Sequence, residues 1–231
     1  MALTHPELWI AGERQVRIPC GLVELEGTLT LPPRPEGLVL FAHGSGSSRH
    51  SPRNRFVARF LQKGGLGTLL FDLLTAPEER LDAVTREYRF DLDLLATRLR
   101  AATRWAAREP ALESLPLGLF GASTGAAAAL MVAADPEAHI GAVVSRGGRP
   151  DLAVEALPKV EAPTLLIVGG LDPEVITLNQ EALERLTHCE RELRLVGGAT
   201  HLFEELGALR TVAGHASDWF RTHLGRRGEA P

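Results

Sequence analysis

Short, continuous apolar runs recur along the chain, and a turn rich in glycine, serine or aspartate follows most of them. Runs of this kind are typical of strands that are buried on both faces of a parallel sheet. The pattern predicts such strands at 38–42, 68–71, 140–145, 164–168 and 192–196, and a further one in the apolar run that leads from Leu115 to Gly121.

Segments whose apolar residues have helical spacing separate these runs. The first helix is expected after Ser51, which can act as an N-cap in front of Pro52, and it should end at Gly64. The long helices that follow the other strands are expected at 90–105, 126–134, 174–186 and 203–224.

The beginning of the chain has a different pattern. Two strands are expected at 15–20 and 22–31, and the second alternates apolar and polar residues, as an edge strand with one wet face does. Strands that alternate with helices over the rest of the chain indicate an α/β fold. We therefore predict one domain over residues 1–231, with its core at about 15–224, and no large cap domain. Its sheet should be doubly wound and mostly parallel, with about seven to eight strands.

Composition limits the possible partners. Apolar residues make up 45% of the chain, as is ordinary for a globular protein, and the mild formal net charge of −4 argues against a nucleic-acid or membrane-surface partner. Cys20 and Cys189 are expected to be buried free thiols, as in a reducing compartment. The first residues lack a signal-peptide pattern, and the longest apolar stretch, 126–134, is too short to cross a bilayer. These features predict a cytoplasmic protein.

The segment LPLGLFGASTG, which ends at Gly125, carries the strongest chemical signal. An apolar run enters the motif G-x-S-x-G, and a helix of small residues follows at once. That order predicts a strand, a sharp turn and a helix, with Ser123 exposed at the top of the turn. Gly121 and Gly125 suit the turn because side chains there would collide with the neighbouring backbone. Ser123 is therefore a candidate nucleophile, and the alternative is an ordinary helix N-cap.

A serine hydroxyl needs a base to take its proton, and an acid can orient that base. Ligands of doubly wound sheets bind at the carboxyl ends of the strands. The turns at those ends include GGLDPEV, which carries Asp172, and GGATHLF, which carries His201. Asp172 could instead be a helix cap, and its rival Asp151 looks more like a helix N-cap. His43 also follows a strand, but its place beside Gly44 favours a bracing role.

With HGSGSS, GASTG, GGLDPEV and GGATHLF in this order, the chain resembles the alpha/beta-hydrolase superfamily and, within it, the dienelactone-hydrolase-like serine esterases. The resemblance implies a nucleophile at Ser123, an acid at Asp172 and a base at His201. It also implies an oxyanion hole made by the backbone N–H groups of Ser45 and Thr124. Dienelactone hydrolase itself has a cysteine nucleophile where this chain has Ser123, so general ester hydrolysis is expected rather than dienelactone hydrolysis.

Two groups of arginines follow strands near these turns, Arg49, Arg53 and Arg55 in one and Arg146 and Arg149 in the other. Most are expected to be solvated or paired with acids. Arg146 is the candidate for binding a substrate carboxylate, since it lies at the carboxyl end of a strand. The loop HGSGSS lacks the ending of a phosphate-binding loop, and the chain has no HExxH or CxxC motif. No cofactor or metal is expected.

These observations predict a carboxylesterase that cleaves short acyl esters through an acyl-enzyme intermediate, with a small-molecule ester as its partner. Only the polar segment 75–89 could cover the site, so a shallow pocket is expected. An acyltransferase, a perhydrolase or a lactonase could use the same residues. A binding domain that keeps the fold without catalysis is a further alternative.

Overall fold

The computed structural model describes residues 12–225. Eight strands form one sheet, in the order β1-β2-β4-β3-β5-β6-β7-β8. The pairs β1–β2 and β2–β4 are antiparallel, and the remaining neighbours are parallel. The strands are β1 (Gly12–Cys20), β2 (Val23–Leu31), β3 (Leu38–Ala42), β4 (Gly67–Phe71), β5 (Leu117–Ala122), β6 (Ile140–Arg146), β7 (Thr164–Gly169) and β8 (Arg191–Val196).

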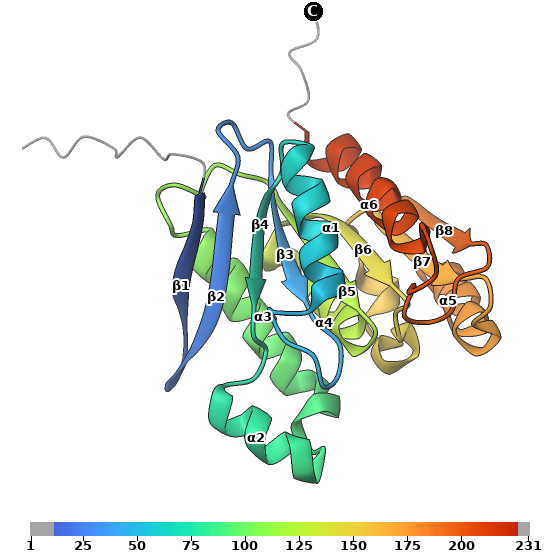
Figure 1. Cartoon of the computed structure of the whole chain (residues 1–231), viewed down its shortest axis with the longest axis horizontal. Coiled ribbons are helices and arrows are strands. Elements are labelled where there is room, and N and C mark those ends of the chain that lie inside the picture. The colour runs from blue at the N-terminus through green and yellow to red at the C-terminus, as the bar shows by residue number, and fades with distance from the viewer. Residues whose placement is uncertain (1–11, 226–231) are drawn as a thin grey trace, which may run out of the picture.

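Helices cover both faces of the sheet (Figure 1). One face carries α1 (Pro52–Lys63) and α6 (Ala208–Leu224), and the other carries α3 (Leu92–Ala106), α4 (Thr124–Ala133) and α5 (Pro173–Arg185). The helix α2 (Ala76–Thr85) projects beyond the end of the sheet. Four short 3₁₀ helices complete the described elements: η1 (Tyr88–Phe90), η2 (Pro136–Ala138), η3 (Pro150–Ala153) and η4 (Leu157–Lys159).

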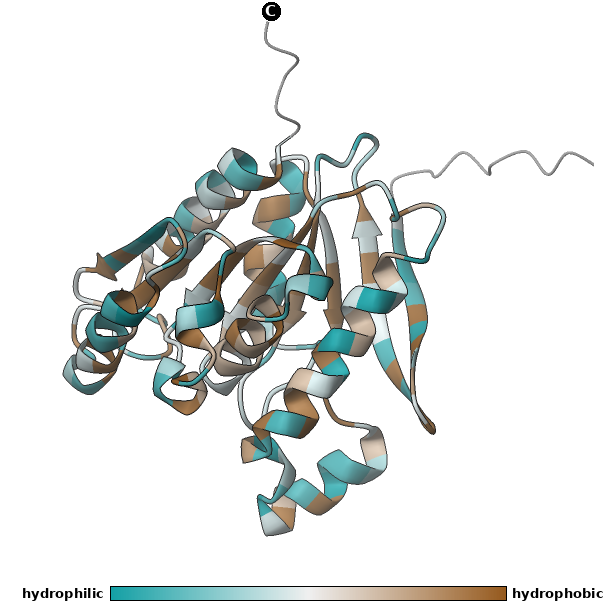
Figure 2. Cartoon of the chain, turned by 180° about the vertical axis from the view of Figure 1, so that it is seen from behind, coloured by the Kyte–Doolittle hydropathy of each residue, from teal (hydrophilic) through white to brown (hydrophobic). Residues whose placement is uncertain are grey.

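The central strands are apolar because both of their faces are covered, as the brown strands between the helices in Figure 2 show. Every residue of β3, β4 and β5 is buried. Along β3, Leu38 and Leu40 pack on the α3–α4 side, while Val39 and Phe41 pack on the α1–α6 side. The predicted α/β class and the doubly wound, mostly parallel sheet are confirmed.

Three local predictions were wrong. Residues 22–31 do not form an edge strand, because β1 pairs with the outer side of β2. The alternation reflects only that one face of β2 is exposed to solvent. The last helix begins at Ala208 rather than at 203, and Phe203 lies in the preceding loop with a φ of 56°. The two cysteines are free but only half-buried.

The segment 75–89 is ordered around α2 and η1. Thr75 and Glu78 form a capping box at the start of α2, and Asp91 caps α3, so that α3 starts two residues later than expected. Within residues 12–225, no helix combines the length and apolar character needed to cross a membrane.

Candidate active site

Ser123 lies at the turn between β5 and α4. Its φ of 52° and ψ of −121° are unusual for a residue with a side chain, and the tightness of the turn explains them. A side chain on Gly121 would meet the backbone of Ala126, and one on Gly125 would meet the carbonyl oxygens of Ala42 and His43. The two glycines of the motif are therefore required by close backbone packing.

The side chain of Ser123 does not cap α4, although the residue occupies the N-cap position. Its backbone N–H donates to the carbonyl oxygen of Arg146 at 3.2 Å, which joins the ends of β5 and β6. The loop after β3 passes directly beside it, since a Cβ on Gly44 would lie 3.1 Å from the Cβ of Ser123. The hydroxyl is thus held at the meeting point of three strand ends and has no hydrogen-bond partner in the described part of the chain.

Asp172 and His201 are brought together from the ends of β7 and β8. Asp172 occupies the N-cap position of α5, yet its side chain makes no capping hydrogen bond. Instead, its Oδ2 lies 2.8 Å from His201 Nδ1. A carboxylate only accepts, so Nδ1 carries the proton and Nε2 is left available as an acceptor. The imidazole keeps 39% of its side-chain surface exposed.

The residues after β6 connect His201 with Ser123. The Arg146 carbonyl accepts the Ser123 N–H, and the next residue, Gly147, lies against the imidazole. A Cβ on Gly147 would be 3.5 Å from both His201 Nδ1 and Cε1. The structure therefore gathers Ser123, Asp172 and His201 at one end of the sheet. In this structure, the Ser123 hydroxyl and His201 are not hydrogen-bonded; such bonds commonly tighten only when substrate binds.

The two residues expected to supply oxyanion donors lie next to each other. Ser45 Oγ and Thr124 Oγ1 are 3.0 Å apart, so their side chains join the loop after β3 to the start of α4. Within residues 12–225, neither backbone N–H has a hydrogen-bond acceptor. Thr124 is the first residue of α4, where unpaired N–H groups and the helix dipole favour negative charge.

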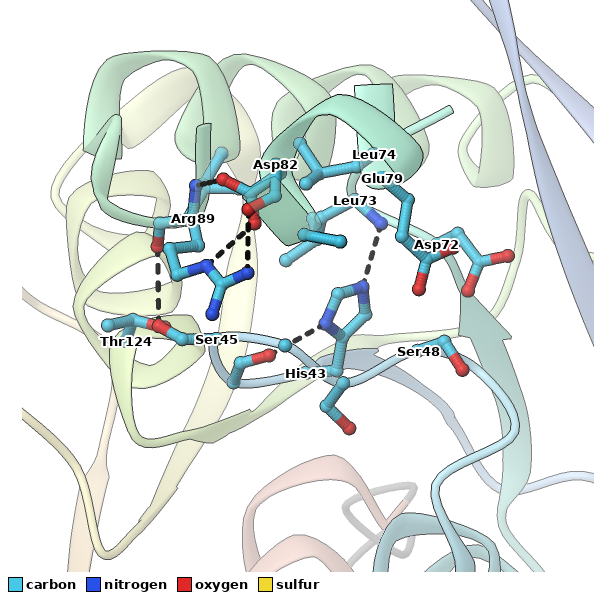
Figure 3. A pocket seen from close by; sticks show the side chains of 15 residues that line it. His43, Ser45, Ser48, Asp72, Leu73, Leu74, Glu79, Asp82, Arg89 and Thr124 are labelled. Atoms are coloured by element: carbon cyan, nitrogen blue, oxygen red, sulfur yellow. Dashed lines mark hydrogen bonds and ion pairs between the residues drawn. The ribbon is translucent and has the colours of Figure 1, made fainter. Parts of the chain in front are cut away.

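His43 braces the same loop from beneath, as its position beside Gly44 suggested. Its Nε2 accepts the backbone N–H of Leu73 at 3.0 Å, and its Nδ1 lies 3.0 Å from the Gly44 carbonyl oxygen (Figure 3). This pair of contacts fixes the neutral tautomer that carries its proton on Nδ1. Burial lowers the pKa of His43, which further favours the neutral ring.

A cavity of about 290 Å³ lies between this loop and the α2–η1 segment (Figure 3). Ser45 and Thr124 lie at one side of it, and Arg89 lines it from η1. Its apolar wall is formed by Leu73, Leu74, Ala83 and Leu95.

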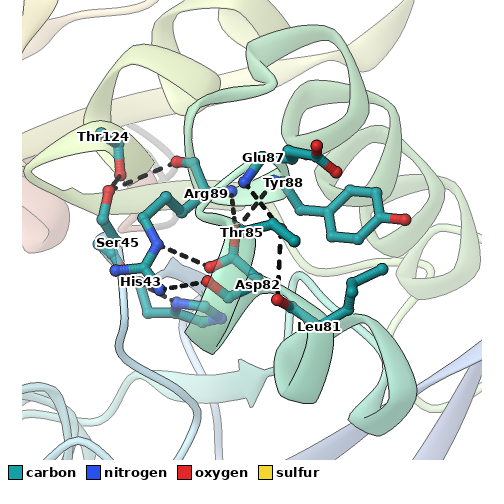
Figure 4. Close-up of polar contacts among 10 residues, drawn as sticks. His43, Ser45, Leu81, Asp82, Thr85, Glu87, Tyr88, Arg89 and Thr124 are labelled. Carbon is teal, nitrogen blue, oxygen red and sulfur yellow. Dashed lines mark hydrogen bonds and ion pairs between the residues drawn. The ribbon is translucent and has the colours of Figure 1, made fainter.

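Asp82 holds the α2–η1 wall in place, and sequence analysis did not identify this residue (Figure 4). Its buried carboxylate accepts from the backbone N–H groups of Tyr88 and Arg89 and from Arg89 Nε at 2.7 Å. The Arg89 carbonyl also accepts a 3.4 Å hydrogen bond from Ser45 Oγ. A single aspartate in a polar segment carries no sequence signal for such a role, since the role depends on how the segment turns back.

Most of the arginines near the site have acidic partners, as expected. Arg49 pairs with Asp72 and Glu26, and Arg53 with Glu204. Among residues 12–225, no carboxylate pairs with Arg55 or Arg146, and of these two only Arg146 is buried.

The prediction of Asp151 as an N-cap was wrong. The N-cap position of η3 belongs to Arg149. The Asp151 carboxylate instead accepts two 2.8 Å hydrogen bonds from the Arg149 guanidinium. This bidentate pairing gives Asp151 a partner other than His201.

The model of the dienelactone hydrolase family matches residues 58–219. A crystal structure described as a dienelactone hydrolase from Anabaena variabilis has 55% sequence identity and a TM-score of 0.91. That match covers 93% of this chain and 99% of the other. The esterase Est1E from Butyrivibrio proteoclasticus shares the fold at 16% identity, with a TM-score of 0.76 over 91% of this chain and 98% of its own.

Two proteins from strains of Mycobacterium tuberculosis, provisionally named phosphoribosyl transferases, are 56% identical over 212 residues. The match covers 92% of this chain and 47% of theirs. The chain therefore spans about half the length of these relatives.

Proposed function

This chain belongs to the dienelactone hydrolase family, whose alpha/beta-hydrolase fold it shares, and we propose that it is a serine carboxylesterase that acts on short-chain esters. The observation that carries the proposal is the 2.8 Å contact between Asp172 Oδ2 and His201 Nδ1, close to a serine held in a sharp strand-to-helix turn. The family is one of hydrolases, and the reaction on a carboxylic ester is our inference from these residues.

In the proposed reaction, Ser123 Oγ attacks the ester carbonyl while His201 Nε2 takes its proton. The tetrahedral intermediate collapses as the bond to the alcohol oxygen breaks, and His201 returns the proton to that oxygen. Water then attacks the acyl-enzyme, gives its proton to His201 and releases the acid, and the proton passes back to Ser123. Asp172 orients the ring and stabilises the imidazolium in both steps.

The negative oxygen of each tetrahedral intermediate would be bound by the backbone N–H groups of Ser45 and Thr124. Their contact through Oγ and Oγ1 supports this role because it holds the loop after β3 in a fixed position against the start of α4 before substrate arrives. Preorganised donors of this kind typically contribute on the order of 2.7–4 kcal/mol each to the transition state.

The cavity beside these donors supports a small acyl group. Its volume of about 290 Å³ lies near the lower end of common ligand pockets, and its apolar wall is small. The α2–η1 segment that forms one side is fixed by Asp82, so the cavity should not lengthen easily to accept a long chain.

Acyl transfer, perhydrolysis and lactone hydrolysis would use the same residues and differ only in what reacts with the acyl-enzyme or in the ester supplied. Assays with water, an alcohol and hydrogen peroxide as competing acceptors would separate them. The name of the Mycobacterium tuberculosis relatives refers to proteins about twice as long as this chain, so we base the proposal on the residues described above.

A fluorophosphonate probe tests the proposal directly. It should label the wild-type protein at one site, which mass spectrometry of the labelled peptide should locate at Ser123. The variant Ser123→Ala should fold, remain unlabelled and lose roughly 10³–10⁶-fold in kcat for p-nitrophenyl acetate. A folded wild-type protein that neither reacts with the probe nor cleaves any ester would favour the non-catalytic binding domain.

A further inference from the structure

Arg146 is a buried cation for which residues 12–225 supply no anionic partner. It exposes only 7% of its surface, and its Nε has no hydrogen-bond acceptor in the described part of the chain. Within residues 12–225, the guanidinium makes one hydrogen bond, from Nη2 to Asn54 Oδ1 at 3.5 Å, and it lies 5.8 Å from the centre of the Phe203 ring. Burial and the nearby charge of Arg53 lower the pKa of Arg146 to about 10, so it is still positive at neutral pH.

Further positive charge surrounds this guanidinium. Asn54 belongs to the first turn of α1, a helix of twelve residues, and that turn contains no acid. Asn54, which Arg146 contacts, therefore lies at the positive end of the α1 dipole. Arg53, in the same turn, also has a buried Nε without an acceptor. The acid that pairs with Arg53 is Glu204, whose side chain is 65% exposed.

Buried charges are costly unless they are paired, and a helix N-terminus adds to the attraction for anions. Two arginines with unused donors thus lie near each other and near one helix N-terminus, and the carboxylate that the described residues supply there is that of the exposed Glu204. An oxyanion, planar or tetrahedral, is the ligand that suits such donors.

Arg146 also has a fixed position relative to Ser123, the candidate nucleophile. Arg146 is the last residue of β6, and its carbonyl accepts the Ser123 N–H. The side chains of β6 alternate, so Val144 packs on the α1–α6 side, and the Arg146 guanidinium lies on that side too, against Phe203. The cavity near Ser45 lies on the other side, against Leu95 of α3.

We propose that Arg146 and Arg53 form a site for an anionic group on the alcohol part of the ester. The inference rests on the proposed esterase function: an acyl group in the cavity near Ser45 leaves the alcohol part to extend toward the α1–α6 side. The substrates would be esters whose alcohol carries a carboxylate or a phosphate.

Matched acetate esters test the site. The substrates are 4-acetoxybenzoate, 4-acetoxyphenyl phosphate and the neutral methyl 4-acetoxybenzoate, and the measurement is the ratio of kcat/KM for each anionic ester to that for the neutral one. In Arg146→Met this ratio should fall roughly 10- to 100-fold, the effect of losing one charge-assisted interaction. Arg53→Met should lower it in the same direction. The anionic ester whose kcat/KM ratio falls further shows whether the site binds a carboxylate or a phosphate.

Arg55→Met is the matched control, since Arg55 lies on α1 but lines a different surface hollow, with His50 and Arg59. It removes the same charge and should leave the ratios unchanged. A wild-type protein with equal kcat/KM for all three esters would overturn the proposal. So would an equal loss on all three in Arg146→Met, which would instead make Arg146 a positioning residue for the His201 loop through Phe203.

A binding measurement separates this proposal from the esterase proposal. Calorimetric titration of 4-hydroxybenzoate and of phenyl phosphate into Ser123→Ala should show binding that the double variant Ser123→Ala/Arg146→Met loses by at least about tenfold. Equal binding to both proteins would refute the anion site even if the enzyme cleaves esters. Arg146-dependent binding without any ester hydrolysis in the wild type would retain the anion site and refute the esterase.

Discussion

Asp172 Oδ2 and His201 Nδ1 lie 2.8 Å apart, although the two residues are 29 positions apart in the chain and belong to loops after different strands. The contact leaves Asp172 at the N-cap position of α5 without a capping bond. The Asp172 carboxylate therefore binds the imidazole instead of capping the helix. In this arrangement the acid sets the tautomer of a histidine that acts as a general base.

The variant Asp172→Asn should therefore keep its fold and lose on the order of 10⁴-fold in kcat, because an amide in this place favours the wrong tautomer of His201. Ester hydrolysis, together with circular dichroism to check the fold, measures the effect. Asp151→Asn is the matched control: it also follows a strand, but its carboxylate pairs with Arg149, so the loss should be small. Reversed results would make Asp151 the acid.

Two glycine substitutions should have opposite effects on stability. In Gly125→Ala the new methyl group would meet the carbonyl oxygens of Ala42 and His43, which are backbone atoms of the central sheet and its following loop. We expect a loss of about 2–3 kcal/mol or more in the free energy of unfolding. Gly214→Ala lies within α6 and its methyl group would meet nothing within 4 Å, so a gain of about 0.5–1 kcal/mol is expected.

Denaturant unfolding of both proteins measures the difference. Similar stabilities for the two variants would contradict the close packing that we assign to the turn at Ser123.

The contribution of Asp82 to stability should depend on pH. Burial alone would raise the pKa of this carboxyl group, but the N–H groups of Arg89 and Tyr88 and the Arg89 charge outweigh burial and lower it. A lowered pKa in the folded state means that the stabilisation is present above the ordinary pKa of aspartate and is lost as the pH falls through the folded-state value. At pH 7, Asp82→Asn should cost about 1–3 kcal/mol of unfolding free energy.

The difference between wild type and Asp82→Asn should shrink steadily when unfolding is measured from about pH 5 downward. Glu87→Gln, which removes an exposed charge from the same segment, provides the comparison and should be neutral at every pH. A difference for Asp82→Asn that stays constant across this range would show that its ion pair with Arg89 does not stabilise the wall.

The length of the acyl group provides a further test of the proposed reaction. With a cavity of about 290 Å³, p-nitrophenyl esters of roughly two to six acyl carbons should react best, because a longer chain would exceed this volume and leave its additional CH₂ groups exposed. The value of kcat/KM should fall steeply by about ten to twelve carbons, measured below the critical micelle concentration. A maximum at about ten carbons or longer would mean that the α2–η1 segment moves to form a longer acyl site.

The sequence alone determined the features that depend on short stretches of chain. Continuous apolar runs identify the strands of a sheet covered on both faces, and the strand, turn and helix around Ser123 follow from local spacing and two small glycines. The loops that carry Asp172 and His201 follow because polar turns after parallel strands meet at one edge of the sheet. The alternation along residues 22–31 indicated a strand with one solvent-exposed face, but it could not show that β1 pairs with the outer side of β2.

Only the tertiary structure decided which side chains meet. Two aspartates follow strands, yet Asp172 contacts His201 while Asp151 is taken by Arg149, a choice that depends on the packing of separate loops. Asp82 joins η1 to α2 only because the segment turns back on itself. Among residues 12–225, Arg146 meets Asn54 and Phe203 on its side of the sheet rather than a carboxylate. The partners of His201 and Arg146 come from residues 29 and 92 positions away, so no local pattern could identify them. Asp82 and Arg149 have partners nearby in the chain, but whether such neighbours meet depends on how the backbone turns between them.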